Sequence, residues 1–330
     1  MIVARPMLRV LATLVIAIQS GSVLALDPSQ KFFQYESSSP NPDSGLPTEI
    51  FDVVEDELGF LWLATPRGLA KYDGVEATTF RVSRYPGLLS NRIRHLFVDS
   101  RNRLLVATEK GLSAFDGATF TPLHGHDADP LLVHAFAEDS AGVVWIAAEE
   151  GLWQLDEKSL TIKRNPADFG SIRSLLWHGN RLHVGGQGRV FVLQGEFLAT
   201  IELPQAYQQA LVYDLESHMG QVWGASGESL FYLNEATAVE VERDALNGGD
   251  IDVLLSDSDQ NLGCASRETL GRFWPDGSIE SPRSDNNALG FSPEITELFE
   301  DSLGQHWHAS SFFGLVLVRD TPIQRTSYTE

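Results

Sequence analysis

A repeat of about 40 residues constrains this chain more than any other feature. LWLAT, the short run around Trp62, follows a tight turn, and a second turn and another short run come after it. The same order returns six more times, at intervals of 43, 40, 38, 40, 40 and 44 residues. The anchor positions are Trp62, Leu105, Trp145, His183, Trp223, Gly263 and Trp307. Repeats with a fixed period of this length indicate a solenoid, a propeller or an array.

The internal order of each unit favours a propeller. An apolar run such as IFDVVED or IRHLFVDS comes first, and three further short runs follow it, the last resembling ATTFRV. Four short strands in about 40 residues match one propeller blade, and helical spacing of apolar residues is absent. We therefore predict an all-β, seven-bladed β-propeller of four-stranded antiparallel blades. The repeats are expected near residues 45–83, 88–124, 129–165, 168–204, 207–244, 247–283 and 291–325.

The two chain ends have to share one blade if the ring is to close without an exposed edge strand. KFFQYES, at Lys31–Ser37, precedes the first unit and has the pattern of an unpaired strand. We expect it to complete the last blade beside GLVLVRD. PIQRTSY, near the C-terminus, is the alternative for the same place.

The first residues have the layout of a secretory signal peptide. Arg5 and Arg9 precede an apolar run over residues 10–18, and small residues lead to Ala25. Residues 1–25 are the predicted signal peptide and 26–330 the predicted propeller, which would be periplasmic or secreted. An uncleaved membrane anchor is the alternative, but the apolar run is shorter than the roughly 20 residues of a bilayer span.

The charge of the chain excludes two classes of partner. It has 45 acidic and 24 basic residues, for a net charge of -21. Such a surface repels phosphate backbones and anionic headgroups, so neither nucleic acid nor direct membrane insertion after signal cleavage is expected. Cys264, the one cysteine, has no partner within the chain and is predicted to be buried.

The recurring acidic and aromatic residues are interpreted as structural. The aspartates Asp56, Asp99, Asp139, Asp257 and Asp301 open the first turn of a unit, where a carboxylate accepts hydrogen bonds from the following backbone amides. One carboxylate per blade cannot converge on a calcium ion. The tryptophans recur at one blade position, as packing between adjacent blades requires.

No catalytic, metal or cofactor motif is found, and no cofactor is expected. The HGHD run, at residues 124–127, has the spacing of two metal ligands but lacks a third. His306 and His308 lie in an expected strand. Propeller enzymes take their catalytic groups from several blades, which a single sequence does not reveal, so an enzyme remains the alternative.

A ligand would sit where the loops between the second and third strands surround the channel mouth. Basic residues are scarce in this chain, yet three of them recur in these loops, and two aromatic residues follow in the last one. The predicted ligand-binding residues are Arg67, Lys110, Glu149, Gln187, Glu228, Arg267, Phe312 and Phe313. They would suit an anionic or polyhydroxylated ligand, with the phenylalanines as a stacking platform.

The stretch GLPTEIFDVVEDELGFLWLATPRGLAKYDG resembles the two-component regulator propeller repeat, with its Gly-Leu-Pro, Asp-x-x-Gly turn, tryptophan strand, Gly-Leu and Tyr-Asp-Gly. The match is close in the first three units, recognisable in the seventh and degenerate in the fourth to sixth. The resemblance implies an extracytoplasmic sensory module that precedes a membrane helix and a histidine kinase or diguanylate cyclase. The last residues, IQRTSYTE, resemble the approach to another unit, which indicates an N-terminal fragment of a longer sensor.

The predicted function is therefore a sensory, ligand-binding propeller of a bacterial signal-transduction protein, without catalysis of its own. Its expected partners are a small-molecule or carbohydrate ligand, or a second propeller or sensor domain, with homodimerisation through a full-length sensor. A lyase or hydrolase acting at the channel mouth and a protein-binding scaffold are the alternatives. A sensor gene continues into an output domain, whereas an enzyme loses turnover when channel-facing residues such as His134 or Glu297 are replaced.

Overall fold

The computed structural model describes residues 35–38, 42–124, 131–156, 159–164, 169–227, 229–241, 250–266, 270–273, 279–280 and 294–320. The predicted signal peptide, the PIQRTSY segment, Glu228 and Arg267 lie outside these ranges. No helix in the described part of the chain is long and apolar enough to cross a membrane.

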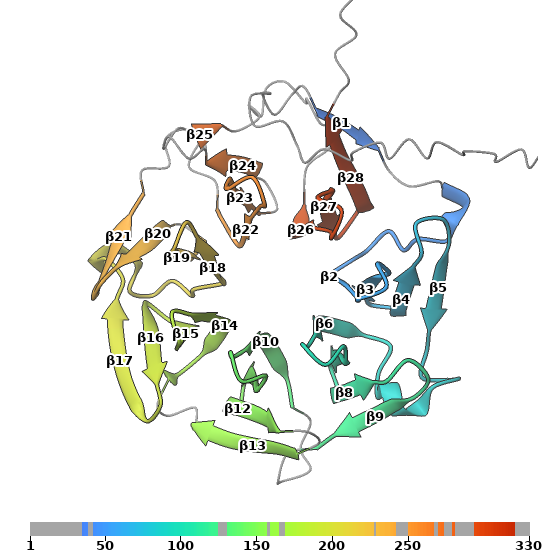
Figure 1. The fold of residues 1–330 in the computed structure, drawn as a ribbon, viewed down its shortest axis with the longest axis horizontal. Helices are drawn as coiled ribbons and strands as arrows, with labels where there is room; N and C mark the ends of the chain where they lie inside the picture. The colour runs from blue at the N-terminus through green and yellow to red at the C-terminus, as the bar shows by residue number, and fades with distance from the viewer. Residues whose placement is uncertain are drawn as a thin grey trace, which may run out of the picture.

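Seven four-stranded antiparallel sheets surround a central channel and confirm the predicted propeller (Figure 1). From the innermost strand outward, the first blade is β2 (Asp52–Glu55), β3 (Leu61–Thr65), β4 (Gly68–Tyr72) and β5 (Ala77–Phe80), and the second is β6 (Ile93–Val98), β7 (Leu104–Thr108), β8 (Gly111–Phe115) and β9 (Phe120–Leu123). The third blade is β10 (Val133–Glu138), β11 (Val144–Ala148), β12 (Gly151–Asp156) and β13 (Ser159–Arg164), and the fourth is β14 (Ile172–His178), β15 (Arg181–Gly186), β16 (Arg189–Gln194) and β17 (Phe197–Glu202).

The remaining three blades follow the same order. The fifth blade is β18 (Asp214–His218), β19 (Gln221–Ala225), β20 (Leu230–Asn234) and β21 (Thr237–Glu240), and the sixth is β22 (Val253–Ser256), β23 (Leu262–Ala265), β24 (Leu270–Phe273) and β25 (Ile279–Glu280). The seventh is β26 (Ile295–Glu300), β27 (His306–Ser310), β28 (Gly314–Asp320) and β1 (Tyr35–Ser38). Short 3₁₀ helices lie at Pro42–Ser44, Pro86–Leu88 and Gln205–Tyr207.

The ring is closed by the N-terminal strand, as the sequence predicts. β1 pairs antiparallel with β28, with Ser37 opposite Val318, and is the outermost strand of the seventh blade. On the inner side, the hydroxyl and the backbone amide of Ser302 both donate to the Glu55 carboxylate, at 2.8 and 2.6 Å. The last and first blades are therefore joined both at the rim and near the channel.

The turn aspartates act as the sequence predicts. Oδ1 of Asp301 accepts the backbone amides of Leu303 and Gln305, at 3.0 and 2.8 Å. Oδ2 accepts the Nε1–H of Trp307 at 2.8 Å. Asp56 repeats this arrangement with the indole of Trp62. A charged acceptor roughly doubles the strength of a hydrogen bond, so each aspartate fixes the first turn and orients the tryptophan of the next strand.

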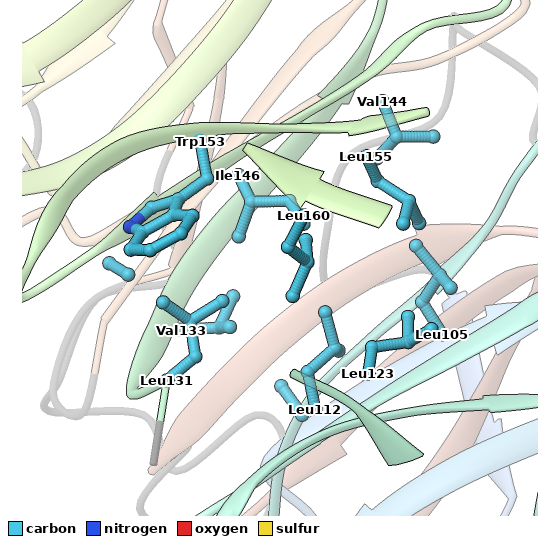
Figure 2. Packing of buried hydrophobic residues seen from close by; sticks show 12 residues of the cluster. Leu105, Leu112, Leu123, Leu131, Val133, Val144, Ile146, Trp153, Leu155 and Leu160 are labelled. Carbon is cyan, nitrogen blue, oxygen red and sulfur yellow. The ribbon is translucent and has the colours of Figure 1, made fainter. Parts of the chain in front are cut away.

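Hydrophobic packing occurs between neighbouring blades. Trp62 packs against Leu96, Val106 and Phe115 of the second blade, and Trp307 packs against residues of the first. These contacts confirm the predicted role of the recurring tryptophans. Figure 2 shows a similar cluster between the second and third blades, whose buried members are Leu105, Ala107, Leu112, Leu123, Leu131, Val133, Val144, Ala148, Ile146, Trp153, Leu155 and Leu160. Burying one such large side chain contributes about 1.5–3 kcal/mol.

The sixth blade departs from this pattern because glycine replaces the tryptophan. Gly263 borders a small internal cavity that is also lined by His306 and His308 of the seventh blade. Burial lowers the pKa of His308 from 6.5 to about 3, so its imidazole is neutral. Cys264 is fully buried, as predicted, and burial raises its thiol pKa to about 12. Of these residues, Cys264 and His306 are buried, and Gly263 and His308 are half-buried.

Candidate functional site

A cavity of about 1030 Å³ occupies the channel. Its wall comes from the first residues of the innermost strands and from the segments that connect consecutive blades. These strands, β2, β6, β10, β14, β18, β22 and β26, surround the centre of the ring in Figure 1. Ligand cavities of proteins commonly measure 300–1,000 Å³, so the channel is large enough for a small molecule.

Imidazole and guanidinium groups lie on one side of the cavity. His95, His134 and Arg173 come from three consecutive blades, at the starts of β6, β10 and β14. Nη1 of Arg173 lies 2.8 Å from both ring nitrogens of His134 and donates to whichever nitrogen is unprotonated. Burial, together with the charge of Arg173, lowers the pKa of His134 to about 4. We call these three residues the basic arc.

Carboxylates lie on the other side of the ring. Asp52, Asp214 and Glu297 line the cavity from β2, β18 and β26. Asp250 and Asp252, which precede β22, add to the same side. We call Asp52, Asp214 and Glu297 the acidic arc. Figure 1 shows β26 across the channel from β10, while β2 adjoins β6 and β18 adjoins β14.

The acidic arc is crowded, and two of its carboxyl groups, those of Asp214 and Glu297, have raised pKa values. Burial raises the pKa of Asp214 from 3.8 to about 6. Glu216, on the same strand, has its pKa raised from 4.5 to about 8 by burial and by Asp214. Burial, followed by the charges of Asp52 and Asp214, raises the pKa of Glu297 well above 4.5. Perturbed carboxyl groups that gather in a cavity are typical of a functional site.

The arcs are locally anchored. Oδ2 of Asp52 accepts the backbone amide of Leu96 at 2.8 Å and lies 3.7 Å from Nδ1 of His95, where the two arcs meet. Oδ2 of Asp214 accepts the amide of Leu254 at 2.8 Å. Each carboxylate therefore bridges from its own blade to the next and is held in place before any ligand arrives.

Aromatic side chains form a third part of the wall. Phe97 and Phe136 stack with ring centroids 5.5 Å apart and planes inclined by 19°, and both line the cavity. Phe51, just before β2, and Tyr213, which is 45% exposed, also line the cavity. A cavity with apolar faces and a few charged groups at fixed positions can orient a ligand.

None of the described loop residues predicted to bind a ligand lines this cavity. Gln187 donates from Nε2 to the side-chain oxygen of Gln209 at 3.1 Å, and Gln209 lines the cavity. Glu149 lies 4.0 Å from Nε2 of His134. Arg67 and Lys110 are exposed on their hairpins, and Phe312 and Phe313 are 66% and 46% exposed. A ligand role for these loop residues stays a prediction.

The side chains of the two arcs were only partly visible from the sequence. His134 and Glu297 were expected to face the channel, and both line the cavity. His95, Arg173, Asp52 and Asp214 were not singled out. Aligning the first strand of each unit by its buried Ile or Val would have placed all six near the channel, because these residues follow that position by one or two.

A metal site is not formed by the described residues, in which no three His, Cys, Asp or Glu side chains converge on one point. Most of the HGHD run lies outside the described ranges.

The comparison with known proteins supports the fold but not a family. No family model matches the sequence. No curated protein matches it either. The resemblance to the two-component regulator propeller repeat therefore continues to rest on the motifs given above.

Solved structures match most of the chain. The extracellular domain assigned to a hybrid two-component system of B. thetaiotaomicron aligns with a TM-score of 0.72 at 19% identity, over 88% of this chain and 41% of its own. A second such domain from the same organism aligns with a TM-score of 0.69 at 19% identity, over 88% of this chain and 40% of its own. The chain thus spans about two fifths of these domains. A catalytically inactive form of virginiamycin B lyase from Staphylococcus aureus, solved with quinupristin, aligns with a TM-score of 0.69 at 9% sequence identity. The alignment covers 86% of this chain and 99% of the lyase chain.

Proposed function

We propose that this chain is the extracytoplasmic sensory propeller of a bacterial signal-transduction protein and that it binds its ligand in the channel. The observation that carries the proposal is the cavity with opposed basic and acidic arcs on a seven-bladed ring. Three features support it: the motifs of the two-component regulator propeller repeat, the leader-like first residues, and the fold shared with extracellular domains of hybrid two-component systems.

The arrangement suggests how binding is converted into a signal. Two carboxylates of the acidic arc contact a neighbouring blade through a backbone amide, Asp52 with Leu96 and Asp214 with Leu254. A ligand that engages these carboxylates changes the contacts between blades. If the ligand binds one packing arrangement better, it shifts the population toward that arrangement, and a partner propeller or sensor domain detects the shift. A homodimer of the full-length sensor would carry the signal across the membrane.

The encoding DNA downstream of the Glu330 codon tests the sensory role. We expect the frame, read from independent genomic clones, to continue through further propeller repeats into an apolar helix and a kinase or cyclase. A stop codon in that frame with no adjacent signalling gene would contradict the sensory role.

A lyase or hydrolase is the second candidate, favoured by one observation. His134 is a neutral imidazole at pH 7, and Glu297, whose pKa is raised, lies in the same cavity. These are the states that a general base and a general acid require. An enzyme would show substrate turnover that the variants His134→Ala and Glu297→Gln each reduce by about 10²-fold or more. A sensor would bind without turnover.

A further inference from the structure

Within the basic arc, His95 lies 3.7 Å from Asp52 and His134 lies 4.0 Å from Glu149, so Arg173 is the member that has no ion-pair partner among the described residues. Arg173 forms no ion pair with any carboxylate of the described residues, although the chain has 45 acidic residues against 24 basic ones. Its contact is with the neutral imidazole of His134. A guanidinium directs a planar fork of N–H donors that matches a carboxylate in geometry. Arg173 is therefore poised to receive an anionic group from a ligand.

The acidic arc presents the complementary situation. Glu297 lines the cavity and has no ion pair with a lysine, arginine or histidine of the described residues. The neighbouring Asp52 and Asp214 repel its charge. A protonated amine placed among these carboxylates would relieve the repulsion and form charge-assisted hydrogen bonds. The two arcs therefore select opposite charges at opposite sides of one cavity.

The space between the arcs suits a ligand larger than a single amino acid. The cavity measures about 1030 Å³, at the upper end of the range for small-molecule sites. The stacked rings of Phe97 and Phe136, from the strands that carry His95 and His134, line it, and Phe51 lines it as well. These apolar faces can contact side chains or a backbone that lie between the two charged ends.

We propose that the channel binds a short peptide with free ends, its terminal carboxylate on Arg173 and its terminal ammonium among Asp52, Asp214 and Glu297. This inference deepens the proposed sensory function and rests on it. It names the class of ligand, a zwitterion with separated charges. A neutral oligosaccharide or a singly charged metabolite would leave one or both arcs without a partner.

Four tetrapeptide libraries of random sequence test the proposal on the chain from Leu26 to Glu330. One library is unmodified, one is N-acetylated, one is C-amidated, and one is blocked at both ends. Retention is measured by equilibrium dialysis and mass spectrometry. We expect the unmodified library to be retained at least about tenfold better than either singly blocked library, and the doubly blocked one to be retained least.

Two variants assign the ends of the peptide. Arg173→Gln should reduce the preference for a free carboxylate over an amide, while the preference for a free amine remains. Glu297→Gln should have the converse effect. Arg181→Gln, an exposed site on the same blade, and Glu57→Gln, in an exposed turn, are the matched controls and should change neither preference.

Other outcomes would overturn the peptide assignment. Equal retention of all four libraries, no retention, or preferences that Arg173→Gln and Glu297→Gln leave intact would each contradict it. A parallel dialysis with neutral oligosaccharides separates the two proposals. If oligosaccharides are retained and Phe136→Ala abolishes their retention, the cavity is a ligand site and only the peptide is wrong. If neither class is retained, the ligand-binding function fails as well.

Discussion

The variant Glu216→Gln should be more stable than the wild type at pH 8. Burial and Asp214 raise the pKa of Glu216 from 4.5 to about 8, so the folded protein keeps this proton where the unfolded chain has lost it. Between these pH values the folded state binds more protons, and stability therefore falls as the pH rises. The decline begins near the unfolded value and ends once the pH passes about 8.

The magnitude follows from linkage. One such group contributes a slope of at most about 1.4 kcal/mol per pH unit, which gives at most about 2 kcal/mol between pH 6.5 and 8. Buried histidines act in the opposite direction at lower pH. Burial lowers the pKa of His134 and His183 to about 4 and that of His308 to about 3, so all three are neutral above pH 6.5. In the unfolded chain these imidazoles still release protons near pH 6.5, but the wild type and a Glu216 variant share that contribution, so the difference between the two proteins at each pH isolates the Glu216 carboxyl group.

Urea unfolding at pH 6.5 and pH 8.0 measures the effect. We expect Glu216→Gln to have a higher free energy of unfolding than the wild type at both pH values, with the gain larger at pH 8.0 than at pH 6.5 by about 1–2 kcal/mol. The glutamine oxygen can still accept the Ser217 amide that Glu216 accepts at 2.9 Å. Glu202→Gln, at an exposed carboxylate that pairs with Arg189 at 3.5 Å, is the control and should change the free energy of unfolding by less than about 1 kcal/mol at both pH values. A variant that is no more stable than the wild type at pH 8.0 would refute the reasoning.

Two further changes test the fold. Asp301→Ala leaves the Trp307 indole and two turn amides without their acceptor, so it should lower the free energy of unfolding by about 3–4 kcal/mol. The control Asp73→Ala, in an exposed turn, should lower it by less than about 1 kcal/mol, and equal losses of the two variants in urea unfolding would contradict the role of Asp301. In the antiparallel pair of β1 and β28, alternate residues of β1 donate their backbone N–H to β28, and proline has no such donor. One of Glu36→Pro and Ser37→Pro should therefore lower the melting temperature clearly more than the other, and two unchanged melting temperatures would contradict closure by β1.

The fold could be predicted from the sequence because its determinants are local and repeated. Asp301 and Trp307 are six residues apart and hydrogen-bonded to each other, and Asp56 and Trp62 repeat the pair. Each unit therefore carries the information for its own first turn and second strand. Seven copies made the period visible even where His183 and Gly263 replace the tryptophan. Closure by β1 followed from the need to pair the last edge strand.

The candidate site was harder to predict because it is assembled from residues that differ from blade to blade. Asp52, Arg173 and Glu297 are separated by more than a hundred residues each, and none belongs to a recurring motif. Loop residues such as Arg67 and Lys110 stand out in the sequence because basic residues are scarce. Their position depends on where the hairpin tips point, and the structure places these two outside the cavity wall. The two arcs form only when the closed ring brings residues of different blades to one channel.

Small molecules that remain bound to the protein provide the most direct test of the channel as a ligand site. The wild type and an Arg173→Gln/Glu297→Gln double variant are incubated with a cell extract, washed and denatured, and the released compounds are compared by mass spectrometry. We predict at least one compound that the wild type retains and the double variant does not. Identical sets of compounds from both proteins would contradict ligand binding in the channel.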